Sequence, residues 1–289
     1  MNNIPSFFIM SNPRSGSSLL RVICEAHSEV TVPPECGFIE WWYNKYKDWR
    51  IEDIKTTRFN EFCIDLASSR KFETWKFDFP AFVNLVNKCL PRDYSELSAL
   101  VHITFGLQKN KNLKVWGDKN NYYIHHIGLL LKLYPNTKFI FIVRDGRDVA
   151  ASYIALKKLN SKSPYVPNLP MGIADIAHQW NYNNIEIFKS LSILGKQRVL
   201  YLRYEDLILD LKNSCKSICL FLNVEFKPSM LEYFKQDLEP KETLDWKMKT
   251  LTKPDKLAIG KYKKELKREE IEVFNSIAKE SLKRFKYEF

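Results

Sequence analysis

Glycine is scarce in this sequence, and the marks of a repetitive protein are missing. Only nine of the 289 residues are glycine, and we find no repeat period, low-complexity tract or Gly/Ser linker. This argues against a loop-rich or repeat architecture, whereas a hydrophobic content of 45% provides ample material for a core. We therefore expect one domain that spans residues 1–289.

The cysteines and the apolar segments exclude several other classes of protein. The six cysteines include no C-x-x-C pair and no Cys/His cluster with zinc spacing. Cys24, Cys215 and Cys219 fall in apolar helical patterns, so we expect buried thiols, which suit a reducing compartment. No apolar run approaches the about 20 residues of a membrane span, and the N-terminus leads directly into a strand instead of a signal-peptide pattern. These features predict a cytoplasmic protein without a membrane span.

Negative charge is in deficit, because the formal net charge is +11. A basic balance favours a polyanionic partner, such as a nucleotide, a nucleic acid or an acidic substrate, although a solvated basic surface would give the same balance. Much of the positive charge lies in "KPDKLAIGKYKKELKREE" near the C-terminus.

Short apolar runs alternate with helical patterns along the chain. Strands are predicted at 6–11, 113–121, 138–145 and 198–207, and the second should break into a turn at Gly117. Residues from about 38 to 112 form an aromatic-rich helical insertion, which we expect on the acceptor side of a binding site. Further helices are predicted at 17–27, 122–134, 146–158, 173–192, 211–222, 228–235 and 268–286.

This alternation predicts an α/β fold with a central, mainly parallel sheet flanked by helices. Ligands bind such sheets beyond the carboxyl ends of the strands. We therefore expect the loops after residues 11, 117, 143 and 203 to face one crevice.

The loop "NPRSGSS" after the first strand indicates an anion site. It opens a helix, whose first N–H groups and dipole favour negative charge. Gly16 permits close approach of the backbone to a ligand, and Ser17 and Ser18 add hydroxyl donors. Arg14 adds a positively charged guanidinium group, which can donate two parallel hydrogen bonds. An ordinary N-capped helix is the alternative. An ATP-binding loop fits less well, because the GxxxxGK[ST] spacing is absent and the apolar run "FIFIV" ends in Arg144 and not in an aspartate for a metal.

The segment "FIVRDGRDVAASY" predicts a second anion site of the same kind. Arg144 stands at the carboxyl end of a strand, and Ser152 lies two turns into the next helix. Asp145 and Asp148 could instead hold Arg144 and Arg147 in structural ion pairs. Two anion sites at the ends of two parallel strands suggest a ligand with phosphate at both ends.

These motifs resemble those of the sulfotransferases that use 3′-phosphoadenosine-5′-phosphosulfate (PAPS). "PRSGSSLL" is similar to their 5′-phosphosulfate loop, "VRDGRDVAASY" to their 3′-phosphate motif, and "LRYEDL" and "IGKYKKEL" to two later landmarks. The resemblance covers nearly the whole chain and is weakest over 40–110. It is strongest to the bacterial and protein-tyrosine sulfotransferases, whose loop carries arginine where the small-molecule cytosolic enzymes carry lysine. It implies a P-loop-like sulfotransferase fold.

The resemblance also implies roles for individual residues. A segment at about 240–266 should close over the cofactor as a lid. Tyr204 is expected near the cofactor, Lys261 on the closing segment, and Arg144 and Ser152 at the 3′-phosphate. The 5′-phosphosulfate would be held by Arg14, Ser15, Gly16, Ser17 and Ser18.

Glu35 and Lys119 complete the implied catalytic set together with Arg14. Glu35 in "VPPECGF" occupies the position of the glutamate base of the tyrosine-sulfating enzymes, and Lys119 matches a lysine that faces the sulfuryl group. His125 and His126 are competing bases. The implied reaction is in-line attack of an acceptor oxygen on sulfur, with release of adenosine 3′,5′-bisphosphate and without a metal.

The acceptor cannot be read from these motifs. A peptide tyrosine, a sugar or a small hydroxylated metabolite would each suit, and a nucleic-acid partner is not expected. Three alternatives remain open: a kinase-like phosphotransferase that depends on ATP and magnesium, a basic nucleic-acid-binding module, and a PAPS-binding protein without turnover.

Overall fold

A computed structural model describes residues 4–159, 161 and 163–288. Its centre is a five-stranded sheet in the order β2-β3-β1-β4-β5, and every neighbouring pair is parallel. The α/β fold with a parallel sheet flanked by helices is therefore confirmed. The strands are β1 (Ser6–Met10), β2 (Val30–Thr31), β3 (Val115–Lys119), β4 (Lys138–Val143) and β5 (Val199–Arg203).

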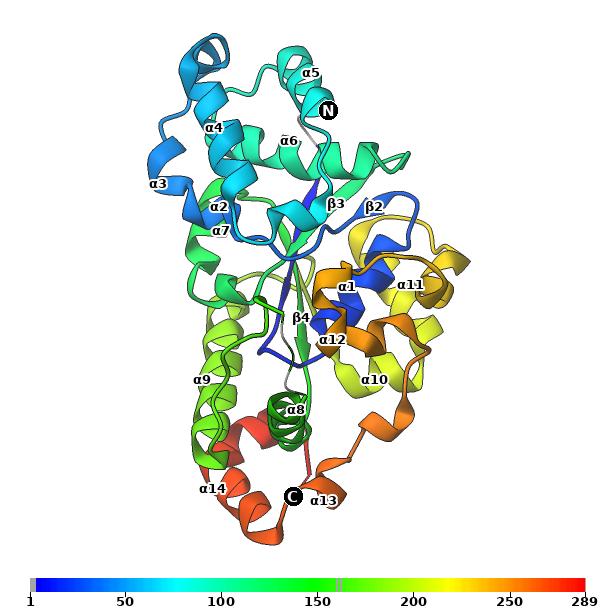
Figure 1. Cartoon of the computed structure of the whole chain (residues 1–289). Helices are drawn as coiled ribbons and strands as arrows, with labels where there is room; N and C mark the ends of the chain where they lie inside the picture. Colours follow the sequence, from blue (N-terminus) through cyan, green and yellow to red (C-terminus); the bar gives the residue numbers. More distant parts are fainter. Residues whose placement is uncertain (1–3, 160, 162, 289) are drawn as a thin grey trace.

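Helices cover both faces of the sheet (Figure 1), with α1, α10 and α11 on one side and α9 and α14 on the other. Alternate residues of β1 enter two separate cores, because Phe7 and Ile9 pack with α1, α10 and α11, whereas Phe8 and Met10 pack into the core that contains α8, α9 and α14. The α-helices are α1 (Ser17–Glu25), α2 (Phe38–Trp41), α3 (Tyr43–Tyr46), α4 (Thr57–Ser68), α5 (Phe79–Cys89), α6 (Tyr94–Leu107), α7 (Ile127–Leu133), α8 (Gly146–Lys158), α9 (Ile173–Ser192), α10 (Tyr204–Leu209), α11 (Leu211–Leu222), α12 (Leu244–Lys247), α13 (Tyr262–Glu265) and α14 (Arg268–Arg284).

The chain between β2 and β3 is helical, as predicted. It contains α2 to α6 and two short 3-10 helices, at Ile51–Lys55 and Phe72–Trp75. Aromatic side chains such as Phe62, Trp75 and Tyr94 pack together in its core. Most of the aromatic residues in this insertion therefore form its interior.

The predicted break of the second strand at Gly117 is wrong. β3 continues through Gly117 to Lys119, and Gly117 pairs with Phe7 of β1. A Cβ at Gly117 would lie 2.4 Å from the Phe7 ring, so this glycine makes room for an aromatic side chain in the sheet. The longer strand carries Lys119 to its carboxyl end.

Two other predicted elements differ in detail. The predicted helix 122–134 is a 3-10 helix at Asn121–His125 followed by α7, and the segment Pro228–Lys235 is also a 3-10 helix. The Asn120 side chain accepts a hydrogen bond from the Tyr122 backbone N–H, which starts the tighter turn. Strand β2 was not predicted, because two residues are too few for a periodic pattern.

The expected burial of Cys24, Cys215 and Cys219 is confirmed. In the part of the chain that the structure describes, no helix is both long and apolar enough to cross a membrane.

Candidate functional site

A cavity of about 860 Å³ opens beyond the carboxyl ends of the parallel strands. Residues at or after the ends of four strands line it: Arg14 after β1, Lys119 at the end of β3, Arg144 after β4 and Tyr204 after β5. The expectation that these four loops face one crevice is therefore confirmed. The parallel arrangement explains the result, because it brings the carboxyl ends of all strands to one edge.

The cavity wall is strongly basic. Among the described residues that line it, eight are lysine or arginine, and Glu35 is the one carboxylate. Buried charges of one sign are costly unless an opposite charge accompanies them. The arrangement therefore suits an anion with several negative charges. The eight basic residues are Arg14, Arg70, Lys71, Lys119, Arg144, Lys247, Lys249 and Lys261.

The loop after β1 has the local geometry of an anion cradle. Arg14 and Gly16 both have left-handed backbone conformations, with φ of 65° and 94°. A Cβ at Gly16 would lie 2.4 Å from the Tyr204 ring, so the loop can pass this ring only with glycine at that position. α1 then starts at Ser17 without a side-chain cap, which leaves its first N–H groups available. The buried Ser15 hydroxyl has no protein partner.

Arg14 joins this loop to two distant segments. Its Nε donates to Ser152 Oγ at 3.2 Å, and its Nη1 donates to the carbonyl oxygen of Trp246 at 3.1 Å. Burial and the nearby Arg144 lower the pKa of Arg14. An anion bound here would offset the repulsion between the Arg14 and Arg144 guanidinium groups.

Arg144 lies over the Tyr204 ring, with its guanidinium carbon 4.4 Å from the ring centre. It donates to the carbonyl oxygens of Ala258, at 2.7 Å, and Arg14, at 3.4 Å, whereas its buried Nε lacks a protein partner. Arg144 therefore lines the cavity and retains one donor without a protein partner.

The alternative that the arginines of the second anion motif form structural ion pairs holds for one of them. Arg147 pairs with Asp145 at 2.8 Å. Asp148 accepts hydrogen bonds from the backbone N–H groups of Gly260, at 2.7 Å, and Tyr262, at 2.9 Å. These bonds place Lys261, between the two, at the cavity wall, where it also pairs with Glu265 at 3.0 Å.

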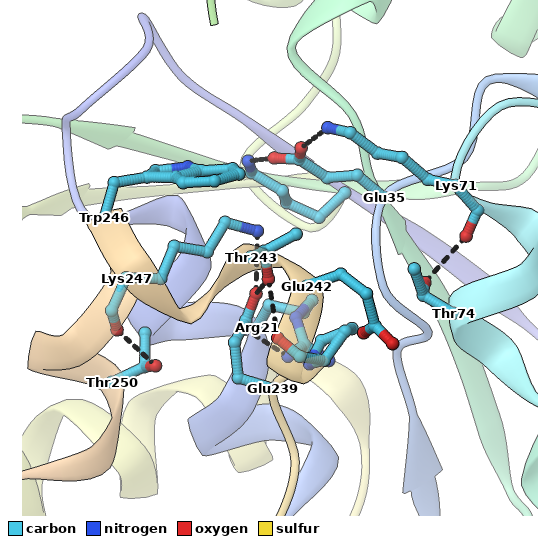
Figure 2. A network of polar contacts seen from close by, with 12 residues as sticks. Arg21, Glu35, Lys71, Thr74, Glu239, Glu242, Thr243, Trp246, Lys247 and Thr250 are labelled. Carbon is cyan, nitrogen blue, oxygen red and sulfur yellow. Dashed lines mark hydrogen bonds and ion pairs between the residues drawn. The ribbon is translucent and has the colours of Figure 1, made fainter. Parts of the chain in front are cut away.

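Glu35 lies between two lysines (Figure 2). Its Oε2 accepts a hydrogen bond from Lys71 at 2.8 Å, and its Oε1 pairs with Lys119. Burial alone would raise the pKa of Glu35, but the charges of Lys119, Lys247 and Lys71 outweigh it and hold the pKa well below its usual range. Burial lowers the pKa of Lys119 to about 8, although Glu35 opposes this shift.

The two histidines proposed as competing bases have neighbours other than Glu35. His125 lines the same cavity and its ring lies 6.2 Å from that of Tyr182. His126 lies 3.9 Å from Glu40. Neither histidine contacts Glu35 in the interactions that the structure describes.

Lys71 and Lys247 were not predicted as site residues. Lys71 precedes the 3-10 helix at Phe72–Trp75 in the helical insertion, and its φ of 72° places its backbone in the left-handed region. Such a conformation costs about 1–3 kcal/mol for a residue other than glycine, and it often occurs at binding sites. No periodic or motif signal in the sequence marks either lysine.

Within the described ranges, no group of three or more His, Cys, Asp or Glu side chains could hold a metal ion. The predicted independence from metal stays a prediction.

Comparisons with known proteins identify relatives along most of the chain. The chain is 22% identical over 245 residues to a protein-tyrosine sulfotransferase of Drosophila melanogaster, which covers 80% of this chain and 40% of the relative. It is 23% identical over 233 residues to protein-tyrosine sulfotransferase 2 of Gallus gallus, which covers 80% of this chain and 54% of the relative. The chain thus spans about half the length of these curated relatives.

Two solved structures share the fold. The sulfotransferase domain from the curacin biosynthetic pathway has a TM-score of 0.64 at 21% identity and covers 99% of both chains. The sulfotransferase domain of the Synechococcus PCC 7002 olefin synthase has a TM-score of 0.62 at 22% identity and covers 99% of this chain and 95% of that domain. The family model described as "Sulfotransferase family" matches residues 5–228, which is more than half of the chain. The chain belongs to the sulfotransferase family.

Proposed function

We propose that this protein moves the sulfuryl group of PAPS to a hydroxyl acceptor and releases adenosine 3′,5′-bisphosphate. The observation that carries the proposal is the charge of the cavity, where eight basic residues and one carboxylate converge at the carboxyl edge of the sheet. Family membership supports sulfotransfer as the reaction. A donor with a phosphosulfate at one end and a phosphate at the other would supply the missing negative charge.

The residues present fit such a donor at both ends. At one end, Ser15 has an unpartnered buried hydroxyl and Gly16 leaves space that a Cβ would fill. The loop amides, Ser17 and Ser18 would complete the 5′-phosphosulfate cradle. At the other end, Arg144 has an unpartnered Nε, and Arg144 and Ser152 both line the cavity. We assign Arg144 and Ser152 to the 3′-phosphate.

Tyr204 and Lys261 would hold the middle of the donor and close the site. The Tyr204 ring is buried and lies against both Gly16 and Arg144, so it forms the floor between the two anion sites. Lys261 belongs to a segment that Asp148 and Arg144 hold through backbone hydrogen bonds. We propose that residues of about 240–266 form the lid over the donor.

The donor, when bound, would supply a sulfuryl group activated as a mixed anhydride with phosphate. Arg14, Lys119 and the loop amides would then stabilise the negative charge that grows on the bridging oxygen during in-line transfer. Arg14 follows β1 and Lys119 ends β3, so both cations reach the carboxyl edge of the sheet, where the donor would lie. Positive groups placed where negative charge develops are a large source of catalysis.

Glu35 would take the proton of the acceptor hydroxyl. The carboxylate is ionised at neutral pH, but Lys71 and Lys119 occupy both of its oxygens. When Lys119 turns to the donor, one oxygen is released and the pKa of Glu35 rises toward the range of a useful base. In this proposal, Glu35 would act as the base only after Lys119 has moved away from it.

The acceptor side of the cavity combines apolar walls with positive charge. Trp41, Tyr122 and Leu169 line it together with Arg70 and Lys71. The curated relatives bear the name protein-tyrosine sulfotransferase, which supports a phenolic hydroxyl as one acceptor. A sugar or a small hydroxylated metabolite fits the same chemistry.

A PAPS-binding protein without turnover is the second candidate. The double pairing of Glu35 with lysines favours it, because a base that stays paired cannot accept a proton. A direct assay separates the two. We expect incubation with PAPS and a tyrosyl peptide, a sugar or a hydroxylated metabolite to yield a product heavier by one sulfuryl group, together with adenosine 3′,5′-bisphosphate, by mass spectrometry. Tight binding of PAPS with no sulfated product from any acceptor class would support the inactive binder.

A further inference from the structure

A buried ionic trio of Arg21, Glu239 and Lys247 lies beside the cavity and outside the predicted anion-binding motifs (Figure 2). Glu239 accepts from Arg21 at 2.6 Å and pairs with Lys247 at 2.7 Å. The exposed fractions of these side chains are 1% for Arg21, 0% for Glu239 and 8% for Lys247. Thr243 donates a further hydrogen bond to Glu239 at 2.9 Å. The trio connects α1 to the C-terminal segment that contains α12.

Lys247 is not needed to neutralise Glu239. Arg21 already supplies one positive charge to this carboxylate, and it is anchored by the carbonyl oxygens of Val32, at 3.1 Å, and Leu238, at 2.7 Å. Burial would raise the pKa of Glu239, but Lys247 and Arg21 outweigh it and lower the pKa to about 2. The trio therefore carries a net charge of one positive unit. We assign this charge to the one member that lines the cavity.

Lys247 is that member, since it lines the cavity. Lys247 and Glu35 both line the cavity, and Figure 2 shows the Lys247 side chain extending toward the side where Glu35 lies. The charge of Lys247 also contributes to the lowered pKa of Glu35 and of Lys119. The preceding residue, Trp246, is held by Arg14 through its carbonyl oxygen at 3.1 Å. Lys247 is thus fixed from two sides, by the anion loop and by Glu239.

We propose that Lys247 binds the sulfuryl group of the donor and that Glu239, backed by Arg21, positions it for this contact. The inference rests on the proposed function. An ammonium group has three donors, and the bond to Glu239 uses one of them. The remaining donors are available to a sulfuryl oxygen. Lys247 would add a third cation to Arg14 and Lys119 at the group that is transferred.

Calorimetric titration of two nucleotides tests this assignment, because only PAPS carries the sulfuryl group. We expect Lys247→Met to reduce the affinity for PAPS by about tenfold, which is the usual effect of losing one charge-assisted hydrogen bond. The affinity for adenosine 3′,5′-bisphosphate should stay within about twofold of the wild type. Lys247→Arg should retain most of the affinity for PAPS. Lys256→Met is the matched control, because Lys256 is exposed in the same segment and lies outside the residues that line the cavity.

A double-mutant cycle tests the positioning role of Glu239. Glu239→Gln should weaken PAPS binding in the wild type and have no further effect on PAPS binding once Lys247 is methionine. A merely structural role would give additive losses, visible also as a lower melting temperature with equal weakening of both nucleotides.

Three results would overturn the inference. Wild-type affinity for PAPS in Lys247→Met would make Lys247 a structural counter-ion. Equal loss of both nucleotides would move its contact away from the sulfuryl group. Failure of the wild-type protein to bind either nucleotide would overturn the proposed function itself, and the inference with it.

Discussion

Glu35→Gln is expected to reduce turnover by about 10²–10⁴-fold, because the variant keeps the shape of the side chain but cannot accept a proton. The site supports this expectation, since Glu35 is the one carboxylate among the described residues of the cavity wall. Binding of adenosine 3′,5′-bisphosphate should change little, because Glu35 lies at the transfer end of the cavity. Single-turnover rates and calorimetric affinities measure the two effects separately.

His125→Ala is the matched control for this experiment. His125 lines the same cavity, but its ring neighbour is Tyr182 and not Glu35. We expect this variant to retain most of the turnover. Full activity of Glu35→Gln together with loss of activity in a histidine variant would move the base to His125 or His126.

Lys119→Ala is expected to reduce turnover by about 10²–10³-fold, which is typical for the loss of one fixed donor to a developing negative charge. The Lys119 side chain is 2% exposed and pairs with Glu35 at the end of β3. Its removal takes away the cation that we assign to the sulfuryl group and also changes the surroundings of the base. Turnover with saturating PAPS is the measurement, and unchanged turnover would refute the assignment.

The protonation of Lys119 adds a pH dependence to this prediction. Burial lowers its pKa to about 8, so the ammonium is charged below this pH and neutral above it. The value of kcat/KM for PAPS should therefore fall by about tenfold per pH unit above about 8, because this parameter reports groups of the free enzyme. Lys119→Arg keeps its charge at alkaline pH, so it should lose this basic limb. A limb that persists in the arginine variant belongs to another group.

The sequence was sufficient to predict which loops meet at the cavity, because parallel strands bring their carboxyl ends to one edge. The structure brings four residues from four separate strand ends to a single cavity: Lys119 is the last residue of β3, and Arg14, Arg144 and Tyr204 follow β1, β4 and β5. The role of Gly117 was misjudged for a physical reason. A glycine that makes room for the Phe7 ring gives the same sequence signal as a glycine in a turn.

The other cations of the site could not be predicted from sequence patterns. Lys71 reaches Glu35 through a left-handed backbone conformation within an irregular helical region. A lysine in the sequence does not predict that conformation, because residues other than glycine rarely adopt it. Lys247 depends on Glu239, whose partner Arg21 lies 218 residues earlier in the chain. Such contacts arise only from tertiary packing, because no local periodicity specifies them.

The proposed function requires the cavity to bind a nucleotide with phosphate at both the 3′ and the 5′ ends. Calorimetric titration of the purified protein with adenosine 3′,5′-bisphosphate, in parallel with AMP and ATP, each with and without magnesium, tests this binding directly. We expect tight binding of the bisphosphate and weaker binding of AMP. In Arg144→Ala, the two nucleotides should bind with similar affinity, because Arg144 is assigned to the 3′-phosphate. Preference for ATP with magnesium, or no binding of the bisphosphate, would contradict the account and favour a kinase-like phosphotransferase.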